Sequence, residues 1–132
     1  MAETGAATRI SGIGTVIVTV SDQDKAIEFF TEKLGFEKRS DSPYGDGQRW
    51  VDVAPPGATT TLAIVPPMAE GTPGGETGVA FATEDIDAEH ADMRERGVDV
   101  DDEVMRMGAP VPPMFFFRDP DGNRYLIVGE PE

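Results

Sequence analysis

One stretch near the end of the chain, MFFFRDPDGNRYLIV at residues 114–128, decides the fold. It contains two β-prone runs on either side of a turn. In the turn, Pro120 presets a negative φ, Asp119 can cap its own turn, and Gly122 and Asn123 tolerate positive φ. The stretch therefore predicts a β-hairpin that ends the domain.

The turn also predicts how the two strands pair. We place Arg118 opposite Asn123, which sets Phe115 opposite Leu126 and Phe117 opposite Arg124. Residues that face each other across a strand pair share one side of the sheet. One side is then expected to carry Phe115, Phe117 and Leu126, and the other side Phe116, Tyr125 and Ile127.

Length and composition limit the functions that the chain can have. The 132 residues predict one domain, 1–132, with a substantial core. The net charge of −14 argues against nucleic acid and anionic membranes as partners, since both require basic surfaces. The absence of cysteine excludes disulfides, thiolate catalysis and cysteine-ligated metals. With no signal-like segment in Met1–Arg9 and no apolar run of spanning length, we expect a cytoplasmic protein.

The first half of the chain predicts one helix and four strands. Valine alternates with threonine and isoleucine in the first strand, Ile10–Val20. Ser21 and Asp24 resemble a capping box for a helix over Asp22–Leu34, which Gly35 ends. Further strands are expected at Phe36–Arg39, Gln48–Ala54 and Thr59–Val65, with a polar loop over Ser40–Gly47.

The second half repeats this order after a linker at 66–76 that is rich in proline and glycine. We expect a strand at Gly78–Thr83, a helix at Ile86–Arg96 capped by Asp85, a short extended Val98–Val100, a strand at Asp101–Met107 and the final hairpin. In this alignment Val16, Val18 and Val20 fall on Val79, Phe81 and Thr83. The chain thus predicts an α+β fold of two βαβββ repeats, 10–66 and 77–129, forming a curved mixed sheet, or cup, with helices on its outer face.

Side-chain alternation predicts which residues line the cup. The larger apolar side chains, such as Val16, Val18 and Phe81, are expected under the helices, and their neighbours on each strand point the other way. The set predicted to line the cup is Thr15, Ile17, Thr19, Trp50, Asp52, Ala63, Gly78, Ala80, Ala82, Phe115, Phe117 and Leu126. Tyr44, Met68, Met105, Met107 and Met114 are placed at its rim.

Two motifs resemble those of the vicinal oxygen chelate superfamily, which includes glyoxalases, extradiol dioxygenases, fosfomycin-resistance enzymes and bleomycin-resistance proteins. The first is the run Asp22-x-x-x-Ala26-Ile27-x-Phe29-Phe30-x-x-x-Leu34-Gly35-Phe36, and the second is Phe116-x-x-Asp119-Pro120-Asp121-Gly122-Asn123. The resemblance covers roughly Ile10 to Val128. It is specific for the fold and says little about the reaction.

The resemblance implies four metal-ligand positions, on the first and last strands of each repeat. In this chain they hold Thr15, Ala63, Gly78 and Leu126. Catalytic divalent metals require imidazole or carboxylate donors, which these side chains do not supply. We therefore expect no metal and no other cofactor. His90 is expected to lie solvated on a charged helix face, and Asp119-Pro120-Asp121-Gly122 is interpreted as a turn and not as a calcium loop.

The aromatic and acidic cup residues lead to the functional hypothesis. Trp50, Phe115 and Phe117 offer flat faces for a planar ligand, and Asp52 can bind a ligand cation or hydroxyl. Together with the resemblance to bleomycin-resistance proteins, this predicts a metal-free homodimer that sequesters a small aromatic or amphipathic molecule. The predicted ligand-binding residues are Thr15, Ile17, Tyr44, Trp50, Asp52, Ala63, Gly78, Phe115, Phe117 and Leu126.

Two other classes of protein stay open at this point. One is a glyoxalase- or dioxygenase-like lyase or isomerase, either metal-independent with Asp52 as the base or with unrecognised metal ligands. The other is a structural or regulatory partner domain whose cup is filled by its own side chains. The sequence also leaves open whether the repeats pair within one chain or across a dimer.

Overall fold

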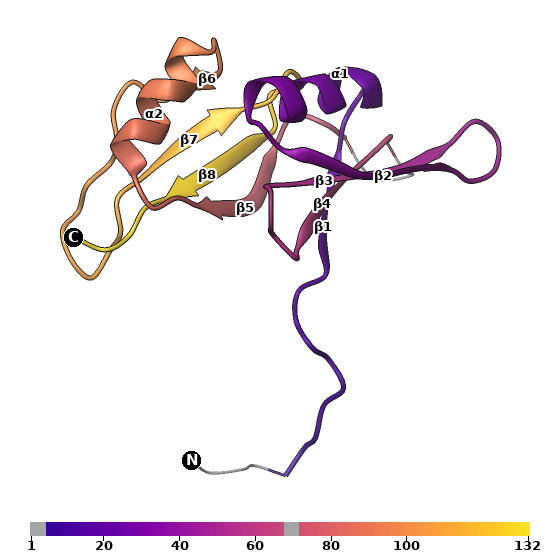
Figure 1. Cartoon of the computed structure of the whole chain (residues 1–132), viewed down its shortest axis with the longest axis horizontal. Helices are drawn as coiled ribbons and strands as arrows, with labels where there is room; N and C mark the ends of the chain where they lie inside the picture. Colours follow the sequence, from indigo (N-terminus) through magenta and orange to yellow (C-terminus); the bar gives the residue numbers. More distant parts are fainter. Residues whose placement is uncertain (1–4, 68–71) are drawn as a thin grey trace.

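The computed structural model describes residues 5–67 and 72–132 and has an α+β fold (Figure 1). Met68, expected at the rim of the cup, lies outside the described residues. The first half contains β1 (Thr15–Thr19), α1 (Gln23–Glu28), the π-helical turn η1 (Phe29–Lys33), β2 (Glu37–Pro43), β3 (Arg49–Ala54) and β4 (Thr61–Val65). The second half contains β5 (Glu76–Ala82), α2 (Ile86–Glu95), β6 (Asp99–Val100), β7 (Met114–Arg118) and β8 (Arg124–Val128).

Each half forms its own four-stranded mixed sheet. The strand orders are β1-β4-β3-β2 and β5-β8-β7-β6, and they are called sheet A and sheet B below. In both sheets the first strand runs parallel to the last, and the other pairs are antiparallel. Within the described ranges no ladder joins the two sheets into a closed barrel. The predicted α+β class with two βαβββ units is confirmed.

Local sequence explains where the helices begin. The Asp22 carboxylate accepts a hydrogen bond from the backbone N–H of Lys25, and the Asp85 carboxylate accepts one from Ala88. The predicted cap at Asp85 is therefore confirmed, whereas the first helix is capped by Asp22 and not by Ser21. Its last turn ends at Gly35, whose φ of 75° suits glycine.

Several predicted boundaries were wrong. β2 continues to Pro43, through the start of the expected loop, because it pairs with β3 over that length. β5 begins at Glu76, inside the expected linker. The expected strand at Asp101–Met107 is only a single bridge between Met105 and Met114. The Asp101 carboxylate accepts a hydrogen bond from the backbone N–H of Phe116 and forms an ion pair with Arg118. This side chain takes the place of a backbone hydrogen bond that a longer strand would make to β7.

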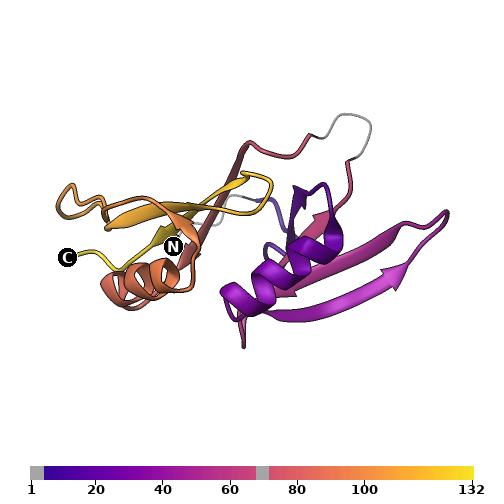
Figure 2. The same ribbon diagram turned by 90° about the horizontal axis from the view of Figure 1, so that it is seen from above.

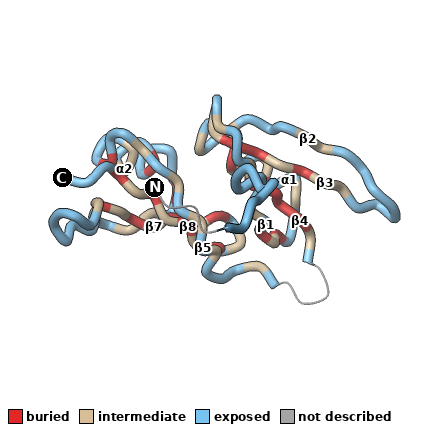
Figure 3. The backbone as a smooth tube through the Cα atoms, turned by 90° about the horizontal axis from the view of Figure 1, so that it is seen from below, coloured by how far each residue is buried: buried red, intermediate tan, exposed pale blue. Residues whose placement is uncertain are grey.

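The two halves share one hydrophobic core, and helix α1 with η1 connects them. Phe30 lies 5.7 Å from Tyr125 in an edge-to-face contact, and Phe29 lies 6.3 Å from Phe117, both distances between ring centroids. Phe36 similarly contacts Phe81 at 5.3 Å. Figure 2 shows α1 between the two halves, and Figure 3 shows buried residues alternating along the strands. Each sheet thus turns one face to the shared core and the opposite face, here called its open face, away from it.

The final hairpin has a register different from the prediction. Arg118 lies opposite Arg124, and Phe115 lies opposite Ile127, so that residues 119–123 make a five-residue turn. Phe115 and Phe117 are consequently fully buried in the core, together with Tyr125 and Ile127. The prediction that placed Phe115 and Phe117 beside Leu126 was wrong by one residue. Phe116 is the aromatic residue that shares the open face with Leu126.

Side-chain hydrogen bonds within the turn explain this register. The buried Asp119 carboxylate accepts bonds from the backbone N–H groups of Asp121 and Asn123, from Asn123 Nδ2 and from the Tyr125 hydroxyl. Because two of these bonds hold Asn123 inside the turn, it is not free to begin the strand. The strand therefore begins at Arg124, one residue later than we predicted.

The same turn connects the two halves of the chain. Asn123 Nδ2 donates to the carbonyl of Thr19 at 2.9 Å, and its Oδ1 accepts from the N–H of Gly74 at 2.7 Å. The Asp121 carboxylate accepts bonds from both the backbone N–H and the hydroxyl of Ser21. The end of β1, the segment before β5 and the final hairpin are thereby fixed together.

Removing the Tyr125 hydroxyl tests this arrangement. Burial, and then the neighbouring Asp119 charge, raise the pKa of Tyr125 above its ordinary value of 10.0. The folded state therefore holds the phenolic proton more tightly, and this contribution is complete below pH ~10 and is lost as the pH rises further. We expect Tyr125→Phe to lower the free energy of unfolding at pH 7 by about 1.5–3 kcal/mol, since Asp119 loses a donor.

We also expect Tyr125→Phe to flatten the decline in stability above pH ~10. Denaturant unfolding, monitored by fluorescence between pH 7 and pH ~11.5, measures both effects. Tyr44→Phe is the matched control, because Tyr44 is exposed and its removal should leave the profile unchanged. An alkaline profile identical in Tyr125→Phe and the wild type would contradict the assignment.

Candidate functional site

The open face of sheet A carries a row of side chains that crosses all four strands. Asp52 pairs with Ser40 on β2 and with Ala63 on β4, and Ala63 pairs with Ile17 on the edge strand β1. Ala63 is fully buried in this row, whereas Ile17 is 57% exposed. Trp50 lies two residues before Asp52 and therefore on the same face, half-buried. On this face Asp52 lies among apolar, aromatic and hydroxyl side chains, while Glu37, opposite Ala54 at the start of β2, is paired with Arg39.

Hydroxyl groups surround the carboxylate of Asp52. Ser40 Oγ donates to Asp52 Oδ1 at 2.7 Å. Thr61 Oγ1 lies 3.5 Å from Asp52 Oδ2 and donates to Thr15 Oγ1 at 2.9 Å. Within residues 5–67 and 72–132, Asp52 forms no ion pair. The site therefore contains a half-buried carboxylate whose neighbours are neutral donors.

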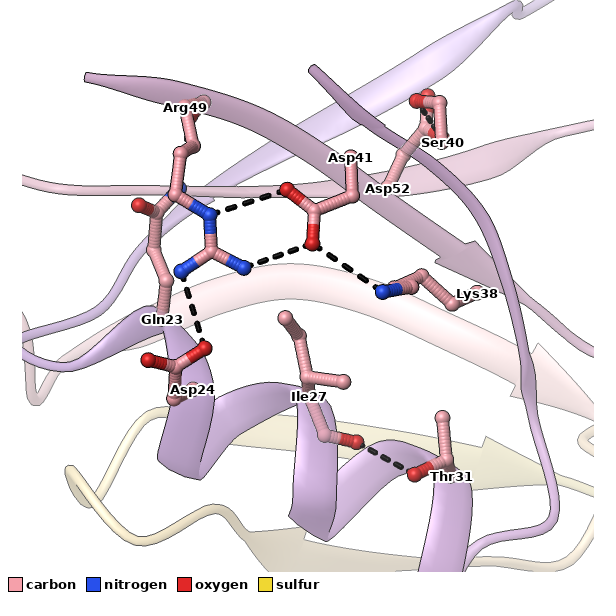
Figure 4. A network of polar contacts seen from close by, with 9 residues as sticks. All are labelled: Gln23, Asp24, Ile27, Thr31, Lys38, Ser40, Asp41, Arg49 and Asp52. Atoms are coloured by element: carbon pink, nitrogen blue, oxygen red, sulfur yellow. Dashed lines mark hydrogen bonds and ion pairs between the residues drawn. The ribbon is translucent and has the colours of Figure 1, made fainter. Parts of the chain in front are cut away.

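An ion-pair network on the other side of the same strands supports this face. Arg49 bonds both carboxylate oxygens of Asp41, at 3.0 and 2.7 Å, and reaches Asp24 on α1 at 2.9 Å (Figure 4). Lys38 adds a bond to Asp41 at 3.1 Å. Gln23 on α1 donates to the backbone carbonyl of Arg49, at 2.8 Å. The network attaches the β2–β3 hairpin to the helix and so holds Trp50 and Asp52 on the opposite side.

The open face of sheet B is aromatic and cationic, and its cations are paired. The Arg124 guanidinium lies 3.9 Å from the centre of the Phe116 ring and also pairs with Glu76. Arg118 pairs with Asp99 at 2.9 Å and with Asp101 at 2.8 Å. Hydrogen bonding and the positive charge of Arg118 lower the pKa of Asp99 below its ordinary value. Phe116 is thus the half-exposed ring of this face.

A crevice of about 560 Å³ lies between β5 and the end of sheet A where β3 turns into β4. Its size falls within the range of small-molecule sites. The crevice is lined mainly by aliphatic side chains, Phe81 and threonine: Ile13, Val16, Val53, Pro55, Ala58, Thr60, Thr61, Leu62, Gly78, Val79, Ala80, Phe81 and Ala82. Thr61 belongs both to the crevice and to the hydroxyl groups beside Asp52. Val16, Leu62 and Val53 belong to the core side of sheet A, so the crevice lies on that side and meets the open-face residues at Thr61.

The structure separates the predicted site residues into four groups. Thr15, Ile17, Trp50, Asp52 and Ala63 share the open face of sheet A. On sheet B, Gly78 lies at the edge and Leu126 on the open face. Tyr44 is exposed at the tip of the β2–β3 hairpin, where its hydroxyl lies 3.3 Å from Gln48 Oε1. Phe115 and Phe117 are core residues and are corrected to that role.

Sequence reasoning missed the contribution of Phe116 and Arg124 to the open face. Both follow from the register of the hairpin, because shifting the pairing by one residue exchanges the faces of every side chain. A signal was present in the turn, since Asp119 and Asn123 can bond each other within a five-residue loop.

His90 is also placed differently from the prediction. Its ring lies 4.8 Å from that of Phe115 in an edge-to-face contact, and Nε2 lies 2.7 Å from the carbonyl oxygen of Asp101. It is part of the packing between α2 and sheet B and is not a solvated residue.

The hypothesis that Asp52 acts as a catalytic base stays a prediction.

The described residues contain no group of three or more histidine, aspartate or glutamate side chains that could hold a metal ion. In the same ranges, no helix is long and apolar enough to cross a membrane.

Comparison with known proteins now identifies the family. Residues 12–127 match the model of the Glyoxalase/Bleomycin resistance protein/Dioxygenase superfamily. The chain belongs to this superfamily. It is 40% identical to YetH, an uncharacterised protein of Bacillus subtilis (strain 168), over 121 residues, which cover 89% of this chain and 98% of YetH. The vicinal oxygen chelate resemblance is thus confirmed.

Two solved structures are similar to this chain over nearly their whole length. One is TnmS3, an antibiotic binding protein from Streptomyces sp. CB03234, with 38% identity and a TM-score of 0.82; the match covers 94% of this chain and 99% of TnmS3. The other is a superfamily member from Sphaerobacter thermophilus DSM 20745, with 37% identity and a TM-score of 0.87, covering 93% and 100% of the two chains.

The network behind the site can be tested by titration. Hydrogen bonds from Arg49, and then from Lys38, lower the pKa of Asp41 from 3.8 to about 2. Because this pKa is lower in the folded state, the associated stabilisation is complete above pH ~4 and is lost as the pH falls through about 2. We expect Arg49→Gln to raise the pKa of Asp41 toward 3.8, and Lys38→Gln to raise it less.

Carboxyl ¹³C chemical shifts measured between pH ~1.5 and pH ~6 report this pKa directly. If Asp41 in the wild type titrates at the ordinary value, the ion pair between Arg49 and Asp41 does not form in solution.

Proposed function

We propose that the protein binds and sequesters a small aromatic or amphipathic molecule without a metal ion. The observation that carries this proposal is that each open sheet face presents a half-buried aromatic ring outside the shared core, Trp50 on sheet A and Phe116 on sheet B. Rings that are not needed for the core and lie on an apolar face are suited to stacking on a planar ligand. Similarity to TnmS3, an antibiotic binding protein, supports the same class of function.

The chemistry of the two faces fits binding better than turnover. The four positions that would hold a metal in metal-dependent superfamily members carry Thr15, Ala63, Gly78 and Leu126, whose side chains are not suitable donors. Sequestration requires shape, stacking and removal of water from apolar surface, which the open faces and the crevice offer. The proposed site contains Trp50, Asp52, Ile17, Phe116 and Leu126, while Phe115 and Phe117 support it from the core side.

The proposed active form is a homodimer in which two copies complete the ligand site. Strands β1 and β5 are edge strands, each paired on one side only. Exposed edges with apolar side chains, such as Ile17 on β1, favour association with another chain. A second copy would place the open face of sheet B opposite the open face of sheet A, so that Trp50 and Phe116 come from different chains. A cytoplasmic location, expected from the composition, remains part of this proposal.

Ligand binding can be measured with the intrinsic fluorescence of Trp50, because it is the single tryptophan of the sequence. A panel of planar antibiotics and aromatic metabolites, first screened by thermal shift, is expected to contain compounds that both raise the unfolding temperature and change Trp50 emission. For such a compound, Phe116→Leu is expected to weaken binding by roughly three- to tenfold, the value of a lost aromatic contact.

Phe115→Leu is the matched control, since it removes the same ring one residue earlier in the same strand. Phe115 is buried in the core, so this change should lower stability and leave affinity within about twofold. The reverse pattern, with Phe115→Leu weakening binding and Phe116→Leu leaving it unchanged, would contradict the proposed site. Absence of any binding across the panel would contradict the function.

The homodimer makes a separate prediction. Ile17→Asp places a charge on the exposed edge strand, and burying that charge at an interface is costly. We expect light scattering after size exclusion to show a dimer for the wild type and a monomer for Ile17→Asp. Val111→Asp adds the same charge at an exposed position in the loop before β7 and should stay dimeric. A wild-type monomer at all concentrations tested would exclude the two-chain site.

A further inference from the structure

Asp52 differs from the other half-buried carboxylates of the sheets in what it contacts. Asp41 is paired with Arg49 and Lys38, and Asp101 is paired with Arg118. Among residues 5–67 and 72–132, Asp52 accepts one short hydrogen bond, from the hydroxyl of Ser40, and the hydroxyl of Thr61 lies 3.5 Å away. An ionised carboxylate accepts about four hydrogen bonds, so most of the acceptor capacity of Asp52 is unused by the described residues.

The surroundings of Asp52 make its charge unusual in this fold. It lies between Ala63 and Trp50, and Glu37, on the same face at the start of β2, is already paired with Arg39. A half-buried charge without a cationic partner costs free energy, which a ligand cation would recover. Arg118 and Arg124 on the open face of sheet B could pair with Asp52 only by breaking existing ion pairs, since Arg118 already bonds two carboxylates and Arg124 pairs with Glu76.

The spacing of Trp50 and Asp52 indicates the shape of a ligand that could contact both residues. Two residues along a strand are separated by roughly 7 Å, and both side chains stand on the same side of the sheet. A fused aromatic ring system of that length can lie against the indole of Trp50 while a protonated amine attached to it reaches the Asp52 carboxylate. The negative charge of the whole chain, −14, attracts such a cation from a distance.

We propose that Asp52 selects ligands that carry a protonated amine beside a planar aromatic ring system. The proposal rests on the binding function argued above and names the ligand class for that same site. Trp50 supplies the stacking surface, Asp52 supplies the ion pair, and Ser40 holds the carboxylate in position by donating to Oδ1. Asp52 is thus the residue that distinguishes cationic from neutral planar molecules.

Two compounds of matched shape test this selection: 9-(aminomethyl)anthracene, which is protonated at pH 7, and 9-anthracenemethanol, which is neutral. Isothermal titration calorimetry of the full chain is expected to show at least about tenfold tighter binding of the amine, the value of one charged hydrogen bond. In Asp52→Asn, which keeps the size of the side chain, the preference is expected to fall below about threefold, with the alcohol affected less than about threefold.

Asp92→Asn is the charge-matched control. Asp92 is exposed on α2, away from the open faces, so this variant removes the same charge and should keep the full preference. The wild type gives a second measurement that does not depend on the folding of a variant. The carboxyl ¹³C signal of Asp52 should shift on addition of the amine and stay in place on addition of the alcohol.

The possible outcomes distinguish the role of Asp52 from the proposed binding function. Equal affinity for the two compounds, or an undiminished preference in Asp52→Asn, would overturn the role of Asp52 while leaving the binding function in place. Binding of neither compound would overturn both. A preference lost equally in Asp92→Asn would show that the overall charge is responsible and would also overturn the inference.

Discussion

The hydrogen bonds of the Asp119–Asn123 turn are the constraint on which the rest of the structure depends. The Asp119 carboxylate is buried, and four donors from its own hairpin satisfy it. Asn123 then reaches out of the turn to Thr19 and Gly74, and Asp121 reaches Ser21. A single turn thereby fixes the register of the last two strands and the position of the first half of the chain against the second. Because its polar groups are buried, breaking any one of them leaves others unsatisfied.

This fixed geometry determines what the open faces can do. With α1 and η1 packed between the halves, the aromatic residues Phe30, Phe81 and Tyr125 are committed to one core. The side chains of the open faces contribute little to the core. Open-face residues such as Trp50 and Phe116 can therefore be changed without loss of the core. A common scaffold with different site chemistry is the physical counterpart of the breadth of this superfamily.

Much of this arrangement could be predicted from the sequence because it is local. The cap at Asp85 and the stop at Gly35 depend on residues within one helical turn. Side-chain alternation correctly placed Trp50 and Asp52 opposite the buried Val51 and Val53, since a strand has a strict period of two. The hairpin register could not be predicted in the same way. It depends on Asp119 and Asn123 closing a five-residue turn, whereas the same residue types also allow a shorter turn, and a slip of one residue moved Phe115 and Phe117 from the predicted cup face to the core.

The error in register changes the chemistry of the site as well as its residue list. With Phe115 and Phe117 on the open face, the second wall would have been purely aromatic. With Phe116 and Arg124 there instead, it carries a ring covered on one side by a guanidinium that is itself paired with Glu76. Arg118 and Arg124 of that wall are both paired with carboxylates, whereas Asp52 on sheet A forms no ion pair among the described residues. Under the proposed function, selectivity between neutral and cationic ligands rests on Asp52, and the opposite wall contributes stacking.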